Sequence, residues 1–146
     1  MRIFVDADAC PVKEIIVEVA KVYGVPVTFV VSFAGYFDRG WDVEQVLVDT
    51  SPQSVDIALI NRVAAGDIVV TQDYGLASLA VGKGAKTISP SGKIFHDGNI
   101  DRMLLQRQIH HEARKAGARM KGPKKRTEED NTRFREQFAR LLANNL

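Results

Sequence analysis

The fold is decided by the stretch Arg2-Ile3-Phe4-Val5-Asp6-Ala7-Asp8-Ala9-Cys10-Pro11 and by the helical pattern that follows it. Its first four residues predict a strand, and Pro11 suits the first turn of a helix. Apolar residues then recur at helical spacing as far as Tyr23, and we expect Gly24 to end that helix. Residues 27–31 are continuously apolar, which is typical of a buried parallel strand. The stretch therefore opens a strand–helix–strand unit.

Strands and helices keep alternating beyond this unit. Three further short strands are predicted, over residues 43–48, 67–71 and 85–88. Between them, we expect Ser51-Pro52 to cap a helix that runs to about residue 65, and residues 73–81 predict another helix. This alternation predicts an α/β fold in three layers, in which helices cover both faces of a central, mainly parallel sheet.

The pattern changes in the last third of the chain, where no further strand is expected. A helix is predicted from Ile100 onwards, followed by a basic loop over residues 117–125. The run Thr127-Glu128-Glu129-Asp130 resembles a capping box, and the apolar stripe of the helix after it predicts that this helix packs on the core. We therefore expect one domain over residues 1–146, with an α/β core (1–98) and a basic helical extension (99–146).

Composition excludes several classes of protein. Hydrophobic residues make up 45% of the chain and charged residues 26%, which are ordinary values for a globular protein. The single cysteine, Cys10, excludes an intramolecular disulfide. Asp6 interrupts the first apolar run too early for a signal peptide, and no window approaches the ~18 apolar residues of a membrane span. We expect a soluble, cytoplasmic protein.

The net charge of +2 hides an uneven distribution. Residues 1–100 carry 8 Lys/Arg against 12 Asp/Glu, a formal charge of −4, whereas residues 101–146 carry 12 against 6, a formal charge of +6. An acidic body with a basic end suggests a polyanionic partner. A solvated helical surface explains the charges equally well, so both interpretations stay open here.

Aspartates occupy the positions where a parallel sheet gathers its functional groups, beyond the carboxyl ends of the strands. They are Asp6 and Asp8 after the first strand, Asp49 after the third and Asp73 after the fourth, with Asp56 in the following helix. Like charges about 4 Å apart cost about 4 kcal/mol even at an effective dielectric of about 20. Such a cluster therefore implies raised pKa values or a bound cation. Oxygen ligands suit one or two Mg²⁺ or Mn²⁺ ions, which often recruit phosphate-bearing substrates.

Each of these residues also has a purely structural interpretation. Asp8 could cap the helix that begins near Pro11, Asp56 could favour its own helix N-terminus, and Asp73 could be the N-cap of the next helix. Cys10 is expected to be a small buried residue, because no histidine lies near it in the sequence. Only the convergence of the acids at one edge favours a functional site.

Three blocks of the sequence resemble the motifs of the YaiI/YqxD family of uncharacterised bacterial proteins. The blocks are 5–11 (VDADACP), 66–77 (GDIVVTQDYGLA) and 122–130 (GPKKRTEED) with Phe134. They follow in the order of the family, and the resemblance spans about residues 1–145. The Arg-His element that precedes the last block has a looser counterpart here, Arg107-Gln108-Ile109-His110.

The resemblance implies a PIN-like or NYN-like nuclease fold, a group of small α/β domains whose members often cut RNA with Mg²⁺ or Mn²⁺. On that resemblance, Asp6, Asp8, Asp56 and Asp73 take the positions of the acidic, metal-binding cluster. The resemblance agrees with the position of these aspartates at the carboxyl ends of the strands. Together they predict that Asp6, Asp8 and Asp73 are the catalytic residues and that Asp56 completes the metal site.

The predicted function is hydrolysis of phosphodiester bonds by a divalent-metal-dependent nuclease, with RNA as the favoured substrate, while the choice between RNA and DNA stays open. A basic segment is expected to hold the phosphates through Arg107, His111, Arg114, Arg119, Lys121, Lys124, Lys125 and Arg126. We expect no membrane partner, and assembly into a homo-oligomer stays open.

Two other functions stay open beside hydrolysis. One is a non-catalytic module that binds RNA or protein. The other is a small phosphomonoesterase, since Asp6-Ala7-Asp8 also resembles the nucleophile motif of haloacid-dehalogenase-like phosphatases. In those enzymes a later acidic motif follows a strand, whereas Gly66-Asp67 precedes one here.

Overall fold

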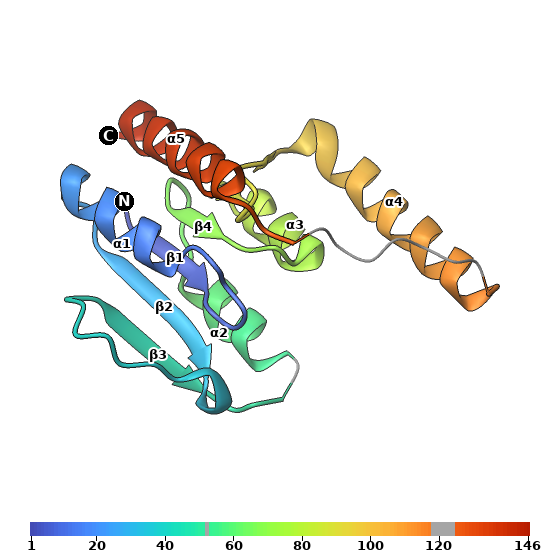
Figure 1. Ribbon diagram of the computed structural model, residues 1–146, viewed down its shortest axis with the longest axis horizontal. Coiled ribbons are helices and arrows are strands. Elements are labelled where there is room, and N and C mark those ends of the chain that lie inside the picture. Colours follow the sequence, from blue (N-terminus) through green and yellow to red (C-terminus); the bar gives the residue numbers. More distant parts are fainter. Residues whose placement is uncertain (52, 118–124) are drawn as a thin grey trace.

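A computed structural model of the chain describes residues 1–51, 53–117 and 125–146, except for the side chains of residues 102–104, 106, 107, 110 and 114 (Figure 1). The strands are β1 (Ile3–Asp6), β2 (Val27–Ser32), β3 (Glu44–Val48), β4 (Ile68–Val70), β5 (Lys86–Ile88) and β6 (Ile94–Phe95). The α-helices are α1 (Lys13–Tyr23), α2 (Ser54–Arg62), α3 (Tyr74–Gly82), α4 (Asp97–Lys115) and α5 (Glu128–Asn145). A short 3-10 helix, η1 (Phe33–Gly35), follows β2 directly.

The strands form one six-stranded sheet in the order β3-β2-β1-β4-β5-β6. Strands β1 to β5 are parallel, and Ile3 of β1 pairs in register with Val27 of β2 and Ile68 of β4. Only β6 runs antiparallel, against β5. The α/β fold with a mainly parallel central sheet is confirmed. Because β1 to β5 all point the same way, their carboxyl ends share one edge of the sheet.

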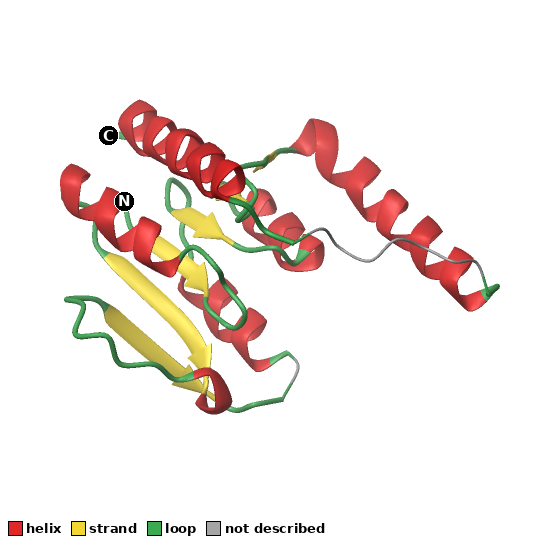
Figure 2. Cartoon of the chain, in the orientation of Figure 1, coloured by secondary structure: helices red, strands yellow, loops and turns green. Residues whose placement is uncertain are grey.

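Helices cover both faces of this sheet, as Figure 2 shows. Ile3 and Val5 face the side covered by α1 and α5, whereas Phe4 between them faces the side covered by α2 and α3. Successive side chains of a strand point to opposite faces, so an unbroken apolar run such as Ile3–Val5 is buried on both sides. Gly24 ends α1 with a φ of +68°, a left-handed conformation that glycine adopts without strain.

The C-terminal helix α5 contributes directly to the core. Its start is the expected capping box, in which Thr127 accepts from the backbone N–H of Asp130 and the Asp130 carboxylate accepts from that of Thr127. The rings of Phe134 and Phe138 stack with centroids 5.2 Å apart and are fully buried, as is Leu142. Helix α5 lies beside α1 (Figure 1), so the predicted apolar stripe is confirmed.

The structure differs from the sequence prediction most clearly at β6, at the start of α2 and at the start of α4. The strand β6 was not predicted, because two residues are too short to produce a recognisable period. Helix α2 begins at Ser54 with Gln53 at its N-cap, so capping by Ser51-Pro52 is wrong, although Ser51 does hydrogen-bond to Ser54. Helix α4 begins at Asp97 rather than at Ile100. Among the described helices, none is long and apolar enough to cross a membrane.

Candidate active site at the carboxyl edge of the sheet

Four aspartates come together at the shared carboxyl edge of the strands. Asp6 is the last residue of β1, Asp8 lies in the loop after it, Asp73 follows β4 and Asp56 lies in the first turn of α2. The negative charges of the other three all raise the pKa of Asp6, which places the four carboxylates in one electrostatic cluster. Each of the four is half-buried, so solvent and a ligand can reach them.

Asp6 is the most perturbed member of the cluster. Its pKa is raised from 3.8 to about 6, first by burial and then by the negative charges of Asp56, Asp73 and Asp8. A hydrogen bond opposes the rise, because the hydroxyl of Thr71 donates to Oδ2 of Asp6 at 2.9 Å. A carboxyl group in this state binds a proton or a cation readily near neutral pH.

Asp73 combines a structural role with membership of the cluster. Its side chain caps α3 by accepting from the backbone N–H of Leu76 at 3.1 Å, so the N-cap interpretation is confirmed. Its own backbone N–H donates to Oγ1 of Thr71 at 3.0 Å. Its charge, after burial, is the second cause that raises the pKa of Asp56. Capping therefore fixes Asp73 in place without neutralising it.

Asp8 is held by the neighbouring strand and not by the helix that follows it. Its Oδ1 accepts from the backbone N–H of Ser32 at 3.1 Å. The N-cap of α1 is Val12, with no side-chain cap, so the interpretation of Asp8 as a helix cap is wrong. Gly35 approaches Asp8 so closely that a Cβ at position 35 would collide with Oδ1 of Asp8. The loop after β1 is thus fitted against the turn after β2.

The basic residues nearest to the cluster in sequence are engaged elsewhere. The ammonium group of Lys13 donates to the carbonyl of Cys10 at 3.1 Å and lies 5.3 Å from the centre of the Phe37 ring. The guanidinium of Arg39 lies 5.2 Å from the centre of the Trp41 ring. Among the described residues, none of the ion pairs involves an acid of the cluster. Within the described part of the chain, the negative charge of the site is therefore not balanced by a salt bridge.

Two further residues singled out in the sequence lie outside this chemistry. Asp49 is exposed after β3 and is not among the charges that shift the pKa of Asp6 or Asp56. Cys10 is buried, as predicted, and burial raises the pKa of its thiol, which makes it a poorer nucleophile.

The donor set of the cluster fits a hydrated divalent cation. The predicted ligands are Asp6, Asp8, Asp56 and Asp73, and in the described ranges no three His, Cys, Asp or Glu side chains are arranged so that all three could hold one ion. Mg²⁺, however, usually keeps several waters and takes only one or two protein carboxylates. Asp6 and Asp73, joined through Thr71, are the pair best placed to provide them.

The predicted basic segment is described only in part. Five of its residues lie outside the described part of the chain, entirely or in their side chains. They are Arg119, Lys121 and Lys124, together with the side chains of Arg107 and Arg114. His111 and Lys125 are exposed. Arg126 is half-buried and donates at 2.7 Å to the carbonyl of Pro90 and to the side chain of Asn131. Arg126 therefore helps to hold the entry of α5 in place.

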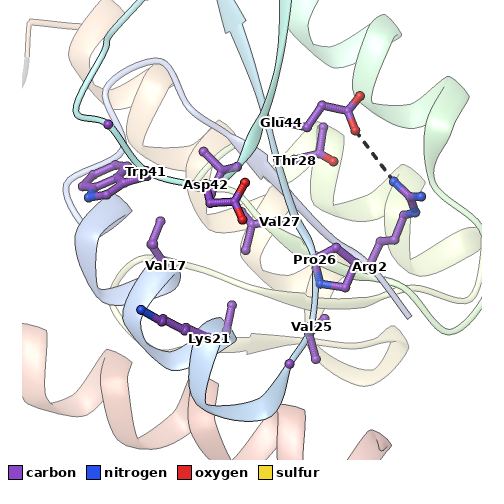
Figure 3. Close-up of a pocket in the computed structure, with 14 residues that line it drawn as sticks. Arg2, Val17, Lys21, Val25, Pro26, Val27, Thr28, Trp41, Asp42 and Glu44 are labelled. Carbon is purple, nitrogen blue, oxygen red and sulfur yellow. Dashed lines mark ion pairs between the residues drawn. The ribbon is translucent and has the colours of Figure 1, made fainter.

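Two cavities lie near opposite ends of the strands. The larger, about 760 Å³, lies at the amino ends of β1 to β3 and contains the exposed ion pair of Arg2 and Glu44, with atoms 3.8 Å apart (Figure 3). None of the four clustered aspartates lines it. The smaller, about 410 Å³, is lined by Gln72 and Tyr74 on either side of Asp73, and by Lys93 and Arg126. None of the four aspartates lines the smaller cavity either, but the chain neighbours of Asp73 do.

Thr71 is the member of the site that the sequence interpretation missed. It is buried, and its hydroxyl joins Asp6 of β1 to the backbone of Asp73 after β4. A threonine directly before the loop that carries Asp73 was the available signal, since hydroxyls commonly bond to backbone groups two residues on.

We expect Thr71→Val to raise the pKa of Asp6 above its value of about 6, because the hydrogen bond that lowers it is lost. The change should also cost about 1–2 kcal/mol of unfolding free energy, since the N–H of Asp73 loses its acceptor. Carboxyl titration by NMR and urea unfolding measure the two effects. Thr71→Ser keeps the hydroxyl and serves as the control, and an unchanged titration in Thr71→Val would contradict the assignment.

Comparison with known proteins gives one family. The profile of the family described as "Uncharacterized BCR, YaiI/YqxD family" matches residues 4–144. A UPF0178 protein from Clostridium acetobutylicum is 46% identical over 145 residues, which covers 97% of each chain. Another, from Ruminiclostridium cellulolyticum, is 47% identical over 134 residues, covering 92% of this chain and 87% of that protein. A mutant of Rae1 (YacP) from Bacillus subtilis, seen in a crystal structure, has 18% identity, a TM-score of 0.45 and full coverage of both chains.

Proposed function

This chain belongs to the YaiI/YqxD family, and we propose that it is a PIN-like, divalent-metal-dependent nuclease that hydrolyses phosphodiester bonds, with RNA as the expected substrate. One observation carries the proposal. Three neighbouring carboxylates raise the pKa of Asp6, and no salt bridge among the described residues offsets their charge. Folding such a cluster without a cation is costly, so an ion that binds there is stabilising.

In this proposal the side chains of the site have different roles. Asp6 and Asp73 would hold the ion directly, with Asp8 and Asp56 accepting hydrogen bonds from its waters. When bound, an Mg²⁺ or Mn²⁺ ion supplies an activated water and stabilises the leaving oxygen of a phosphodiester. Thr71 keeps Asp6 in position. Lys93 and Arg126, which line the adjacent cavity, offer positive charge to the phosphates of the strand.

A basic surface that binds phosphates makes affinity depend on salt. We expect Lys125→Ala to lower the slope of log affinity against log salt by about 0.7 for a single strand, while the melting temperature stays the same, because Lys125 is exposed. Arg126→Ala should instead cost about 2 kcal/mol of stability, since its charged hydrogen bond to the Pro90 carbonyl is lost.

Binding titrations from low to high salt, with melting curves for both variants, measure these effects. Lys86→Ala, which changes an exposed lysine of β5, is the control. An unchanged slope in Lys125→Ala would indicate that this residue is solvated surface.

The experiment that tests the function is incubation of the metal-free protein with single-stranded RNA, with and without Mn²⁺. We expect cleavage only with the ion, and chelation should abolish it. Binding without cleavage, together with weak and non-saturable uptake of Mn²⁺, would indicate a non-catalytic binding module. Release of phosphate from monoesters with oligonucleotides left intact would indicate a phosphomonoesterase.

A further inference from the structure

Two exposed aromatic rings lie next to the carboxylate cluster. Phe33 is 61% exposed and Tyr36 is 56% exposed. The chain has 7 Phe, 3 Tyr and 1 Trp, all within the described residues, and only these two are more than half exposed. Phe37, the very next residue, instead packs edge-on against Phe29 with ring centroids 5.3 Å apart. Among the aromatic residues of this segment, Phe33 and Tyr36 are therefore the ones whose rings are mostly exposed to solvent.

Both rings belong to one short turn. Phe33 begins η1 and Tyr36 is its C-cap, and the backbone N–H of Tyr36 donates to the carbonyl of Phe33. Residues three apart in a 3-10 helix project from the same side, because the helix has three residues per turn. Figure 2 shows this turn at the end of β2, on the same edge of the sheet as the loop that follows β1.

The turn is fixed to the site through Asp8. The carboxylate of Asp8 accepts from the backbone N–H of Ser32, whose own hydroxyl accepts from the backbone N–H of Gly35 at 3.3 Å. Gly35 leaves no room for a side chain between this turn and Asp8. The backbone that carries the two rings is thus anchored against the loop that holds Asp8.

We propose that Phe33 and Tyr36 form a stacking platform that holds unpaired nucleobases of a single-stranded nucleic acid while its backbone meets the carboxylate cluster. This inference rests on the proposed function and names its substrate class. Aromatic faces bind bases of any sequence, since every base has a π-face. A duplex keeps its bases stacked inside, so only a single strand or an unpaired end can use such a platform.

The test is the affinity of the full chain for two short strands of equal length, one of oligouridine and one of abasic sugar-phosphate. Ca²⁺ replaces Mn²⁺ so that the strands stay intact. We expect wild type to bind the base-bearing strand about tenfold more tightly or better. The double variant Phe33→Ala/Tyr36→Ala should lose this preference, keep its affinity for the abasic strand and keep its salt slope, because no phosphate contact is removed.

Two further variants make the result specific. Phe33→Tyr/Tyr36→Phe retains both rings and should retain the preference. Val22→Ala/Leu79→Ala removes two exposed apolar side chains of α1 and α3 and should behave as wild type. Equal binding of both strands by wild type, or a preference that survives in the alanine variant, would overturn the platform.

The outcomes also separate this inference from the nuclease proposal. Mn²⁺-dependent cleavage by wild type without a preference for bases overturns the platform and leaves the nuclease standing. A base preference lost in the alanine variant, without cleavage under any metal, supports the platform and overturns the nuclease. If neither strand binds and none is cut, both proposals fail.

Discussion

Asp73→Asn and Asp8→Asn should each reduce Mn²⁺-dependent cleavage of single-stranded RNA by about a hundredfold or more, because a correctly placed ion supplies several kcal/mol and each 1.4 kcal/mol is a factor of ten. Both changes remove a charge and keep a hydrogen-bond acceptor. Asparagine can still cap α3 at position 73, and at position 8 it can still accept from Ser32. Loss of activity would therefore report the charge and not the fold.

Asp49→Asn is the matched control for these two variants. Asp49 is an exposed aspartate that follows β3 at the same edge, and it does not shift the pKa of Asp6. Its substitution should leave cleavage unchanged. Full activity in Asp73→Asn, or equal losses in all three variants, would contradict a role for the cluster. Melting curves of each variant exclude unfolding as the cause.

Asp6→Asn should stabilise the metal-free protein at neutral pH. The pKa of Asp6 is about 6 in the fold against 3.8 as its ordinary value, so the unfolded chain loses this proton first. Stability from this group is therefore greatest below about pH 4 and falls as the pH rises to about 6. Asparagine removes the penalty and can still accept from Thr71. We expect a gain of about 2–3 kcal/mol above pH 6, or about 6–10 °C in melting temperature.

Calorimetric melting at about pH 4 and at about pH 7.5 measures this difference. The gain should vanish at the lower pH, where the carboxyl is protonated in both states, and Mn²⁺ should stabilise wild type but not the variant. Asp49→Asn again serves as the control. A variant that is less stable than wild type at neutral pH would show that Asp6 is structural, with its charge already balanced.

Much of this arrangement could be predicted from local sequence patterns. The unbroken apolar strands and the amphipathic helices between them are sufficient to predict a parallel sheet, and a parallel sheet brings the ends of its strands to one edge. The aspartates that follow β1 and β4 could therefore be assigned to one site without any knowledge of contacts. The capping box of α5 could also be predicted, since the motif that forms it spans only four residues.

What could not be predicted depends on contacts between distant residues. Asp8 bonds to Ser32, which lies 24 residues away, and no local pattern distinguishes this from a helix cap. Thr71, which follows β4, bonds to Asp6 of β1, which lies 65 positions earlier in the sequence. The exposure of Phe33 and Tyr36 depends on which aromatic rings of the segment pack on Phe29. Strand order and side-chain packing decide these points, and neither has a short-range signal.

The central claim is that the carboxylates around Asp6 bind a divalent cation. Titration calorimetry of Mn²⁺ into the metal-free full chain tests it most directly, at neutral pH and again below the pKa of Asp6. We predict saturable binding of one or two ions with release of protons, weaker binding at the lower pH and loss of binding in Asp6→Asn/Asp73→Asn. Non-saturable uptake of Mn²⁺, or saturable binding that the double variant retains, would contradict the claim.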